Sequence, residues 1–404
     1  MADETREVRY DYSRLIVPVG PVHPALKEPV HFKVTVRKEE VVDVSLRLGH
    51  VHRGIEALAE TRNLVQAMYL IERICGICSH SHTTCFVGAL EEIANAQPSE
   101  RALYLRTLIF ELERLHSHLL FLGVMAYEIG FDTLFMFTWH SRETVLDLFE
   151  EITGNRIHHS MNVIGGVRWD IDHRMEEKIA SSMSKMRKAA QYIRDVFQDK
   201  TVEKRLSRIG LLDHNMAREL CTVGPTARGS GLKMDIRKDD PYAAYGELKD
   251  SFSVVTRTEG DAYARTEVRI HELFETINII DTILDRLPSG TIRPKETVLR
   301  SMSRMPQGEA VSRVEAPRGE LLYFVRTDGK GGLRRLKVRT PTLANIVGLR
   351  YMLIGNEIAD IPVVVASIDP CLSCANRITI IDREGGDARV VDLEALRRKR
   401  RWSF

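Results

Sequence analysis

Four of the six cysteines in this sequence form two pairs with the same spacing. Cys75 and Cys78 lie in "ERICGICSHSH", and Cys371 and Cys374 lie in "SIDPCLSCANR". Four soft thiolate ligands suit Zn²⁺, an iron–sulfur cluster or a centre of nickel and iron, whereas one pair taken alone could also form a redox disulfide. From Cys78 to Cys371 the chain advances 293 positions, which is awkward for a local zinc clip. We therefore expect a buried centre around which a whole domain folds, with structural zinc as the alternative.

Polar residues of the kind that a catalytic centre needs surround both pairs. Arg73 and His82 bracket the first pair, and Ser367 and Asp369 precede the second. A structural zinc site needs no charged groups directed at it, whereas a catalytic centre uses such groups to orient ligands and to carry protons. The two segments therefore favour a catalytic centre over a purely structural metal site.

The overall composition excludes several classes of protein. The 404 residues carry a net charge of +2 and are 44% hydrophobic, which fits a globular protein and gives no support to a nucleic-acid partner. No window of about 18 apolar residues is present, so we expect no membrane-spanning helix. The N-terminus lacks the apolar core of a signal peptide, and six cysteines are too few for a disulfide scaffold. These features indicate a cytoplasmic protein with reduced thiols.

Apolar residues at steps of three and four predict a long helical block in the middle of the chain. Its first helix follows Pro98-Ser99, with a possible break at Gly123. A second helix covers 132–153 and ends at Gly154-Asn155, and two more cover about 173–198 and 260–287.

Shorter segments on both sides of this block have the alternation of β-strands. Residues 31–48 predict a hairpin, and so do the segments on either side of "GKGG" at 329–332. Residues 342–355 are expected to be helical, and "IPVVVASID" is expected to be a short buried strand that leads into Cys371. The predicted fold class is α+β, mainly α, with a central bundle of long helices flanked by small β elements. We expect a single domain over 1–404, made of an N-terminal β region (1–50), a helical core with the first cysteine pair (51–290), a hairpin with the second pair (291–377) and a tail (378–404).

Several longer motifs contain the cysteine pairs or lie between them and on either side. They include "GPVHPALKEP" (20–29), "RICGICSHSH" (73–82), "ELERLHSHLLFLG" (111–123), "EAPRGE" (315–320) and "DPCLSC" (369–374). Together these motifs resemble the large subunit of [NiFe] hydrogenases over nearly the whole chain. The resemblance is strongest to the energy-converting branch, which is related to the quinone-site 49 kDa subunit of respiratory complex I. Complex I subunits share most of these motifs but lack the four cysteines, so this chain resembles a metal-bearing member.

The resemblance implies ligands for a centre of nickel and iron whose iron carries carbon monoxide and two cyanides. It implies that Cys75 and Cys371 bind nickel terminally, and that Cys78 and Cys374 bridge the two metals.

The resemblance also implies roles for residues around the metals. Pro317 and Arg318 match the motif whose guanidinium overhangs the metal pair, and Asp369 matches the residue that pairs with this arginine. Ser367 matches a donor to cyanide. Two further matches are His82, beside the ligands, and Glu28, a carboxylate that carries protons from a cysteine.

A hydrogenase large subunit of this branch implies partners as well. They are a small subunit with Fe–S clusters, complex I-like membrane and antiporter-like subunits, and ferredoxin or formate dehydrogenase as electron donor. The chain would then be peripheral on the inner face of the cytoplasmic membrane. A sulfane sulfur reductase on the same scaffold is an alternative, and a zinc-holding scaffold without catalysis is another. In hydrogenases the tail after the position of Arg377 is commonly removed, whereas we expect the sulfane sulfur reductases to keep it.

Overall fold

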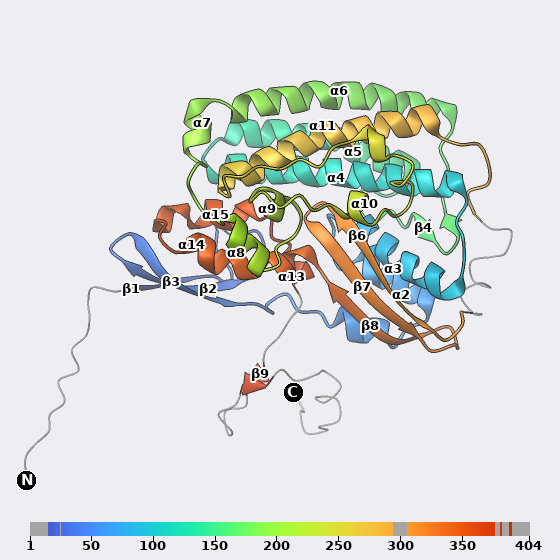
Figure 1. Ribbon diagram of the computed structural model, residues 1–404, viewed down its shortest axis with the longest axis horizontal. Coiled ribbons are helices and arrows are strands. Elements are labelled where there is room, and N and C mark those ends of the chain that lie inside the picture. The colour runs from blue at the N-terminus through green and yellow to red at the C-terminus, as the bar shows by residue number, and fades with distance from the viewer. Residues whose placement is uncertain (1–14, 25, 294–304, 376–379, 382–387, 390–404) are drawn as a thin grey trace, which may run out of the picture.

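The computed structural model describes residues 15–24, 26–293, 305–375, 380–381 and 388–389 (Figure 1). The predicted cleavage position at Arg377 and nearly all of the tail lie outside the described residues. Among the described residues, no helix combines the length and the apolar character that a membrane crossing requires.

Four long helices make up one layer of the molecule. They are α4 (Glu100–Glu128), α5 (Asp132–Thr153), α6 (His173–Phe197) and α11 (Ala262–Arg286). Figure 1 shows them side by side across the upper half of the view, where α4 contacts α5 and α11, and α6 contacts α5 and α11. The predicted helices are confirmed to within a few residues at their ends.

Local sequence explains where these helices begin and continue. Ser99, Asp172 and Asp261 each accept a hydrogen bond from a backbone N–H in the first turn of α4, α6 and α11, which is the usual N-cap arrangement. The predicted break at Gly123 is wrong, because α4 runs through this residue. A Cβ atom at Gly123 would lie 2.5 Å from both Thr138 Oγ1 and Trp139 Cδ1 of α5. This glycine therefore allows two helices to approach closely instead of ending one.

Two three-stranded antiparallel sheets flank the helices, and the other strands of the described residues form the two-stranded pairs β4-β5 and β9-β10. The N-terminal sheet has the order β1-β2-β3, from Leu15–Val19, His31–Arg37 and Glu40–Arg47, so the predicted hairpin is confirmed and gains an edge strand. The second sheet has the order β6-β7-β8, from Glu309–Ala316, Gly319–Thr327 and Leu333–Arg339. Its β7-β8 hairpin was predicted, whereas β6 was not. The mainly helical α+β class is confirmed.

The segment that leads into the second cysteine pair corrects the sequence interpretation. Residues Ile361–Ser367 form helix α15, not a strand. Pro362 lies in the first turn of this helix, where the backbone N–H that proline lacks would have no helical partner. A short apolar run of this kind has no periodicity that separates a buried helix from a buried strand.

The remaining elements connect these layers. The first cysteine loop follows α2 and continues into α3, which starts directly after Cys78. The second loop follows α15 and contains the 3₁₀ turn η4. The short elements are α1 (Ile55–Ala59), α2 (Leu64–Glu72), α3 (Ser79–Ala94), β4 (Asn162–Val163), β5 (Gly166–Val167), α7 (Lys200–Lys204), α8 (His214–Glu219), α9 (Gly224–Arg228), α10 (Ile236–Asp239), η1 (Lys249–Ser251), α13 (Pro341–Asn345), η2 (Ile346–Gly348), α14 (Leu349–Leu353), η3 (Ile358–Asp360), η4 (Leu372–Cys374), β9 (Ile380–Ile381) and β10 (Ala388–Arg389).

The buried apolar residues form two clusters. The larger one joins the long helices to α2, α3 and the sheet β6-β7-β8, and the smaller one joins the sheet β1-β2-β3 to α14 and α15. Cys371 and Cys374 belong to the larger cluster, whereas Leu372 between them belongs to the smaller one. The second cysteine pair therefore lies at the seam between the two clusters.

Candidate metal centre

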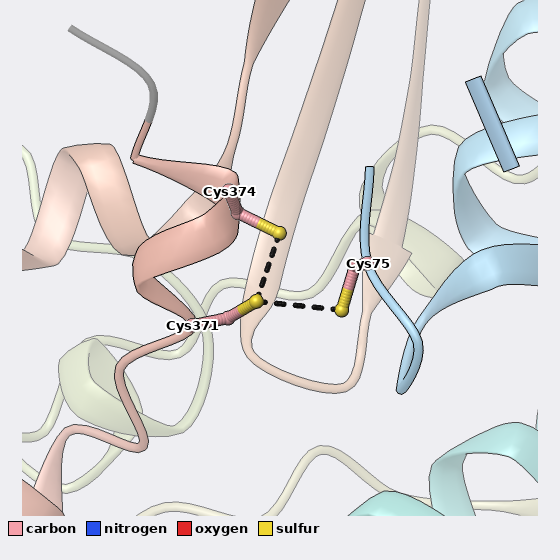
Figure 2. Close-up of side chains that lie close together, drawn as sticks. All are labelled: Cys75, Cys371 and Cys374. Carbon is pink, nitrogen blue, oxygen red and sulfur yellow. Dashed lines mark hydrogen bonds between the residues drawn. The ribbon is translucent and has the colours of Figure 1, made fainter. Parts of the chain in front are cut away.

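The fold brings the two distant cysteine pairs together at a buried point (Figure 2). Cys371 Sγ lies 3.4 Å from Cys75 Sγ and 3.1 Å from Cys374 Sγ. Cys78 Sγ, Cys374 Sγ and a ring nitrogen of His82 lie within 4.8 Å of one another in a second, overlapping group. All four cysteines are free thiols that lie less than a tenth exposed. The quartet therefore offers four soft donors to one site.

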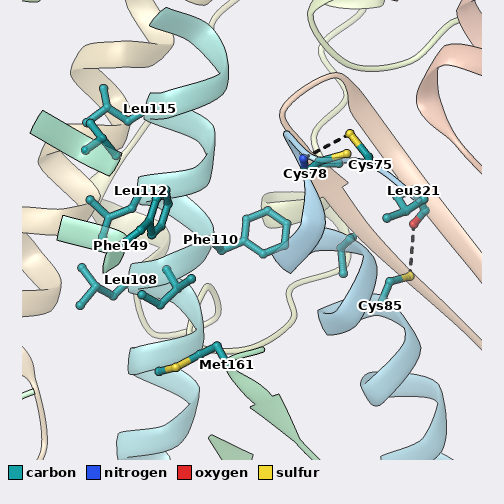
Figure 3. Packing of buried hydrophobic residues seen from close by; sticks show 14 of the residues in the cluster. Cys75, Cys78, Cys85, Leu108, Phe110, Leu112, Leu115, Phe149, Met161 and Leu321 are labelled. Atoms are coloured by element: carbon teal, nitrogen blue, oxygen red, sulfur yellow. Dashed lines mark hydrogen bonds between the residues drawn. The ribbon is translucent and has the colours of Figure 1, made fainter. Parts of the chain in front are cut away.

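The first pair occupies the turn between α2 and α3. Cys75 Sγ accepts a hydrogen bond from the backbone N–H of Cys78, at 3.4 Å (Figure 3), and another from that of Ile77, at 3.2 Å. Cys78 is itself the N-cap residue of α3, so this helix fixes its backbone. Glu113 of α4 accepts hydrogen bonds from His80 N, at 2.6 Å, and Ser81 N, at 2.9 Å. The first turn of α3 is thereby tied to the helical core.

Polar side chains from distant segments hold the second pair. Thr342 Oγ1 accepts a hydrogen bond from Cys371 N, and Thr340 Oγ1 donates one to Cys374 O, both at 3.0 Å. The carboxylate of Glu28 accepts hydrogen bonds from the backbone N–H groups of Leu372 and Ser373. Burial and the charge of Cys371 raise the pKa of Glu28 above its ordinary value. The sequence analysis named Glu28 but neither threonine.

Arg53 connects the two cysteine loops. Its guanidinium donates to Arg73 O at 2.9 Å and to Ile74 O at 2.6 Å, and also to Ser373 O at 3.3 Å. Sequence reasoning missed Arg53, because no local pattern marks a residue whose three acceptors lie on two segments so far apart.

A buried ion pair lies beside the sulfurs. Arg318 Nη2 donates to Asp369 Oδ1 at 2.8 Å, and Arg318 Nε donates to the Asp369 carbonyl oxygen at 2.8 Å. A third bond runs from Arg318 Nη1 to Ser117 Oγ of α4, at 3.2 Å. Burial opposes the charge of Arg318, but Asp369 and the neighbouring cysteines outweigh this effect and raise the pKa of Arg318. A fixed positive charge therefore faces the sulfur quartet.

The turn between β6 and β7 sets the position of this arginine. Pro317 is buried in that turn, directly before Arg318. The next residue, Gly319, has a φ of +123° and packs against Gly224. A Cβ atom on Gly224 would lie 2.3 Å from Gly319 Cα and 2.5 Å from Arg318 O. The two glycines allow a backbone contact that a side chain would prevent.

His82 and Ser367 have different surroundings. His82 Nδ1 lies 2.7 Å from the Tyr323 hydroxyl, and His82 Nε2 lies 3.7 Å from Cys374 Sγ. Burial lowers the pKa of His82 to about 4, so its ring is neutral at pH 7. Ser367 Oγ donates to Val364 O at 2.7 Å and accepts from Arg265 Nε at 3.0 Å. The structure thus places His82 against a cysteine, whereas it directs the Ser367 hydroxyl proton to the backbone of α15.

The crowding of the sulfurs indicates what the site can hold. Hydrogen bonds from Cys374 and Cys75 lower the pKa of Cys78 to about 7. In contrast, the hydrogen bond between Cys374 and Cys371 raises the pKa of Cys374, because adjacent sulfurs cannot all carry negative charge. A bound cation removes this conflict, since metal ligation deprotonates thiols. The donor set therefore fits a soft metal centre.

Comparison with known proteins identifies the family. The sequence profile of "Respiratory-chain NADH dehydrogenase, 49 Kd subunit" matches residues 128–377, and that of "Nickel-dependent hydrogenase" matches residues 53–126. The membrane-bound hydrogenase subunit alpha of Pyrococcus furiosus is 42% identical over 94% of this chain and 91% of its own length. The chain belongs to the energy-converting branch of the [NiFe]-hydrogenase large subunits, the branch related to the 49 kDa subunit of complex I.

Two further members of this family show the same likeness. Formate hydrogenlyase subunit 5 of Escherichia coli is 37% identical over 96% of this chain and 67% of its own length. A chain from the solved structure of the membrane-bound sulfane sulfur reductase, an archaeal respiratory membrane complex, superimposes with a TM-score of 0.86. It is 31% identical and covers 91% of this large subunit and 99% of the solved chain. The family and the sulfur quartet agree, because the four cysteines are consistent with a nickel–iron site.

Proposed function

We propose that this chain is the catalytic large subunit of a membrane-associated, energy-converting [NiFe] hydrogenase. Its reaction would be the reversible reduction of protons to H₂. The main support is the convergence of four buried sulfurs beside the Arg318–Asp369 pair. Further support is the 42% identity, over 94% of this chain, to a protein named membrane-bound hydrogenase subunit alpha.

In this proposal Cys75, Cys78, Cys371 and Cys374 hold a nickel–iron centre whose iron carries carbon monoxide and cyanide. When bound, this centre supplies the change of oxidation state that interconversion of H₂ with protons and electrons requires. The chain itself provides a pocket that excludes water, because the four ligands are buried.

Three further residues act around the ligands. Arg318 presents a fixed positive charge and hydrogen-bond donors to the pocket, and Asp369 orients this guanidinium through two bonds. Glu28 holds and releases protons next to the second cysteine loop, where its carboxylate already contacts the backbone of residues 372–373. In the proposal, Pro317 shapes the turn before Arg318, and His82 packs beside Cys374.

The proposed partners follow from the related complexes. A small subunit with Fe–S clusters passes electrons to the centre, and complex I-like membrane and antiporter-like subunits couple the reaction to ion translocation. Ferredoxin or a formate dehydrogenase is the electron donor. In this arrangement the chain lies peripherally on the cytoplasmic face of the membrane.

A second candidate function is the reduction of sulfane sulfur. The observation that favours it is the TM-score of 0.86 to a chain of the sulfane sulfur reductase, with 99% of that chain covered. A third reading, a zinc-holding scaffold without catalysis, requires only the four cysteines.

The test is made on the native complex purified with its partner subunits. Nickel and iron are quantified, and infrared spectra are recorded over the range that contains the carbonyl and cyanide bands. H₂ evolution and sulfide release from polysulfide are both followed with reduced ferredoxin as the electron donor. We expect nickel, diatomic bands and H₂ evolution. Sulfide release from polysulfide without H₂ would support sulfane sulfur reduction instead of hydrogenase activity. Stoichiometric zinc without nickel would overturn both enzymatic functions.

A further inference from the structure

Two buried arginines one turn apart on α11 contact the same residue of α15, and sequence analysis singled out neither. Arg265 donates from Nε to Ser367 Oγ at 3.0 Å, from Nη1 to Gly260 O at 2.9 Å and from Nη2 to Gly210 O at 2.8 Å. Each of its guanidinium nitrogens has an acceptor. Arg265 is therefore a structural anchor between α11, α15 and two backbone turns.

Arg269 has a different set of contacts. Its Nη1 donates to Arg265 O at 2.9 Å and to Ser367 O at 3.3 Å, and its guanidinium lies over the Phe121 ring at 4.1 Å. The residue is 0% exposed, yet Nε and Nη2 have no hydrogen-bond partner among the described residues. A buried cation without an opposing charge is costly, so the free edge of Arg269 requires an explanation.

Asp369 partly offsets the charge of Arg269, although no hydrogen bond or ion pair joins the two side chains. One carboxylate oxygen, Oδ1, is bonded to Arg318, whereas Oδ2 is buried and without a partner in the described part of the chain. Asp369 is also the opposite charge that acts most strongly on Arg269, and it opposes the effect of burial, which lowers the pKa of Arg269 to about 10. Arg269 therefore stays charged at pH 7, and the Asp369 carboxylate acts on two guanidinium groups, by direct contact with Arg318 and through its charge alone on Arg269.

We propose that Arg269 is a positioning residue for the metal centre. It donates a hydrogen bond to the carbonyl of Ser367, four residues before Cys371, and so it fixes the segment that leads into this cysteine. Arg269 and Arg318 both act on the charge of Asp369, which lies two residues before Cys371. This inference rests on the proposed function, because it concerns the charge that a bound nickel–iron centre experiences.

The test uses native complexes that carry Arg269→Gln or Arg269→Lys, together with Arg106→Lys as a matched control. Arg106 is also a buried arginine with an unpartnered Nε, but it pairs with Glu91 through Nη1 and Nη2. Nickel content and the infrared frequencies of the carbonyl and cyanide ligands are measured in each complex. Glutamine removes the charge but keeps an amide donor, and lysine keeps the charge.

We expect Arg269→Gln to shift the bands to lower frequency, because loss of a nearby positive charge leaves more electron density on the iron. Arg269→Lys and Arg106→Lys should leave the bands in place. Unshifted bands in Arg269→Gln, or equal shifts in the glutamine and lysine variants, would overturn the inference. If the glutamine complex does not assemble, a shifted spectrum in Arg269→Lys overturns it as well. Absence of diatomic bands in the unchanged complex would instead remove the proposed function itself.

Discussion

The two cysteine loops reach the same point by different physical means. Cys75 and Cys78 belong to a turn that continues directly into α3, and the helical core determines where this turn lies. Cys371 and Cys374 lie in a short 3₁₀ turn at the edge of both apolar clusters, where side chains from residues 28, 340 and 342 hold the backbone. The first loop is thus positioned mainly through the helix that continues it and through Glu113 of the helical core, whereas the second is held by side chains from three separate positions outside that core. Changes to single polar residues should therefore disturb the second loop more than the first.

The largest effect should come from the ligands, where the two loops are equivalent. Cys75→Ser and Cys371→Ser each replace a soft thiolate by a hydroxyl, which binds nickel poorly at neutral pH. We expect the nickel content of both variants to fall to the level found in complexes without a metal centre, as measured by elemental analysis of the purified complex. Full nickel content in either variant would show that the sulfur quartet is not one site.

The next effect concerns the ion pair beside the second loop. Arg318→Met leaves Asp369 buried without its main cation, and such a change typically costs about 3–5 kcal/mol. We expect a clear loss of stability in chemical unfolding of the large subunit, together with reduced nickel content. Arg326→Met on the same hairpin is the control, because its ion pair with Glu309 is half exposed and worth about 0–1 kcal/mol. Equal effects of the two substitutions would contradict the buried role of Arg318.

A pH experiment tests the carboxyl group that ties the first loop to the helical core. Burial raises the pKa of Glu113, which binds the first turn of α3, to about 7 from an ordinary value of 4.5. Between these two values the folded state holds more protons than the unfolded state, so stability falls as pH rises. At about 1.4 kcal/mol per pKa unit, the free energy of unfolding of the unchanged chain should fall by up to about 3 kcal/mol relative to Glu113→Gln.

The measurement is urea unfolding of the unchanged chain and the Glu113→Gln variant at pH 4.5 and pH 8. A difference between the two proteins that stays constant, or that changes in the opposite direction, would show that folding does not raise the pKa of Glu113.

The smallest effect tests the second loop by single hydrogen bonds. Thr340→Val and Thr342→Val each remove one bond to the backbone of a cysteine, worth about 0.5–1.5 kcal/mol. We expect faster amide hydrogen exchange at residues 371–375 and unchanged exchange at 75–79. Thr282→Val, which removes a bond within α11, is the control. Amide exchange that rises equally in both loops would contradict the claim that these hydrogen bonds position the second loop alone.

The sequence predicted what depends on local pattern. The long helices follow from apolar periodicity and from caps such as Ser99 and Gly154, and their boundaries are close to those observed. The strand predicted before Cys371 is a helix, since seven apolar or small residues show no period. Residues such as Arg53, Thr340 and Arg269 were not found, because their contacts depend on segments brought together only by the complete fold. The predicted roles of the individual site residues remain predictions; these residues are Cys75, Cys78, Cys371, Cys374, Glu28, His82, Pro317, Arg318, Ser367 and Asp369.

The contact between Gly224 and Gly319 limits how this centre can be altered. Two backbones touch there without any intervening side chain, immediately beside the carbonyl of Arg318. An added methyl group at either position would clash with the opposite backbone, so the turn between β6 and β7 would have to move and the Arg318 guanidinium would move with it. Engineering aimed at a different metal or substrate can therefore vary the residues around the sulfurs. It should leave both glycines unchanged, because the position of Arg318 depends on a contact that only residues without a side chain can make.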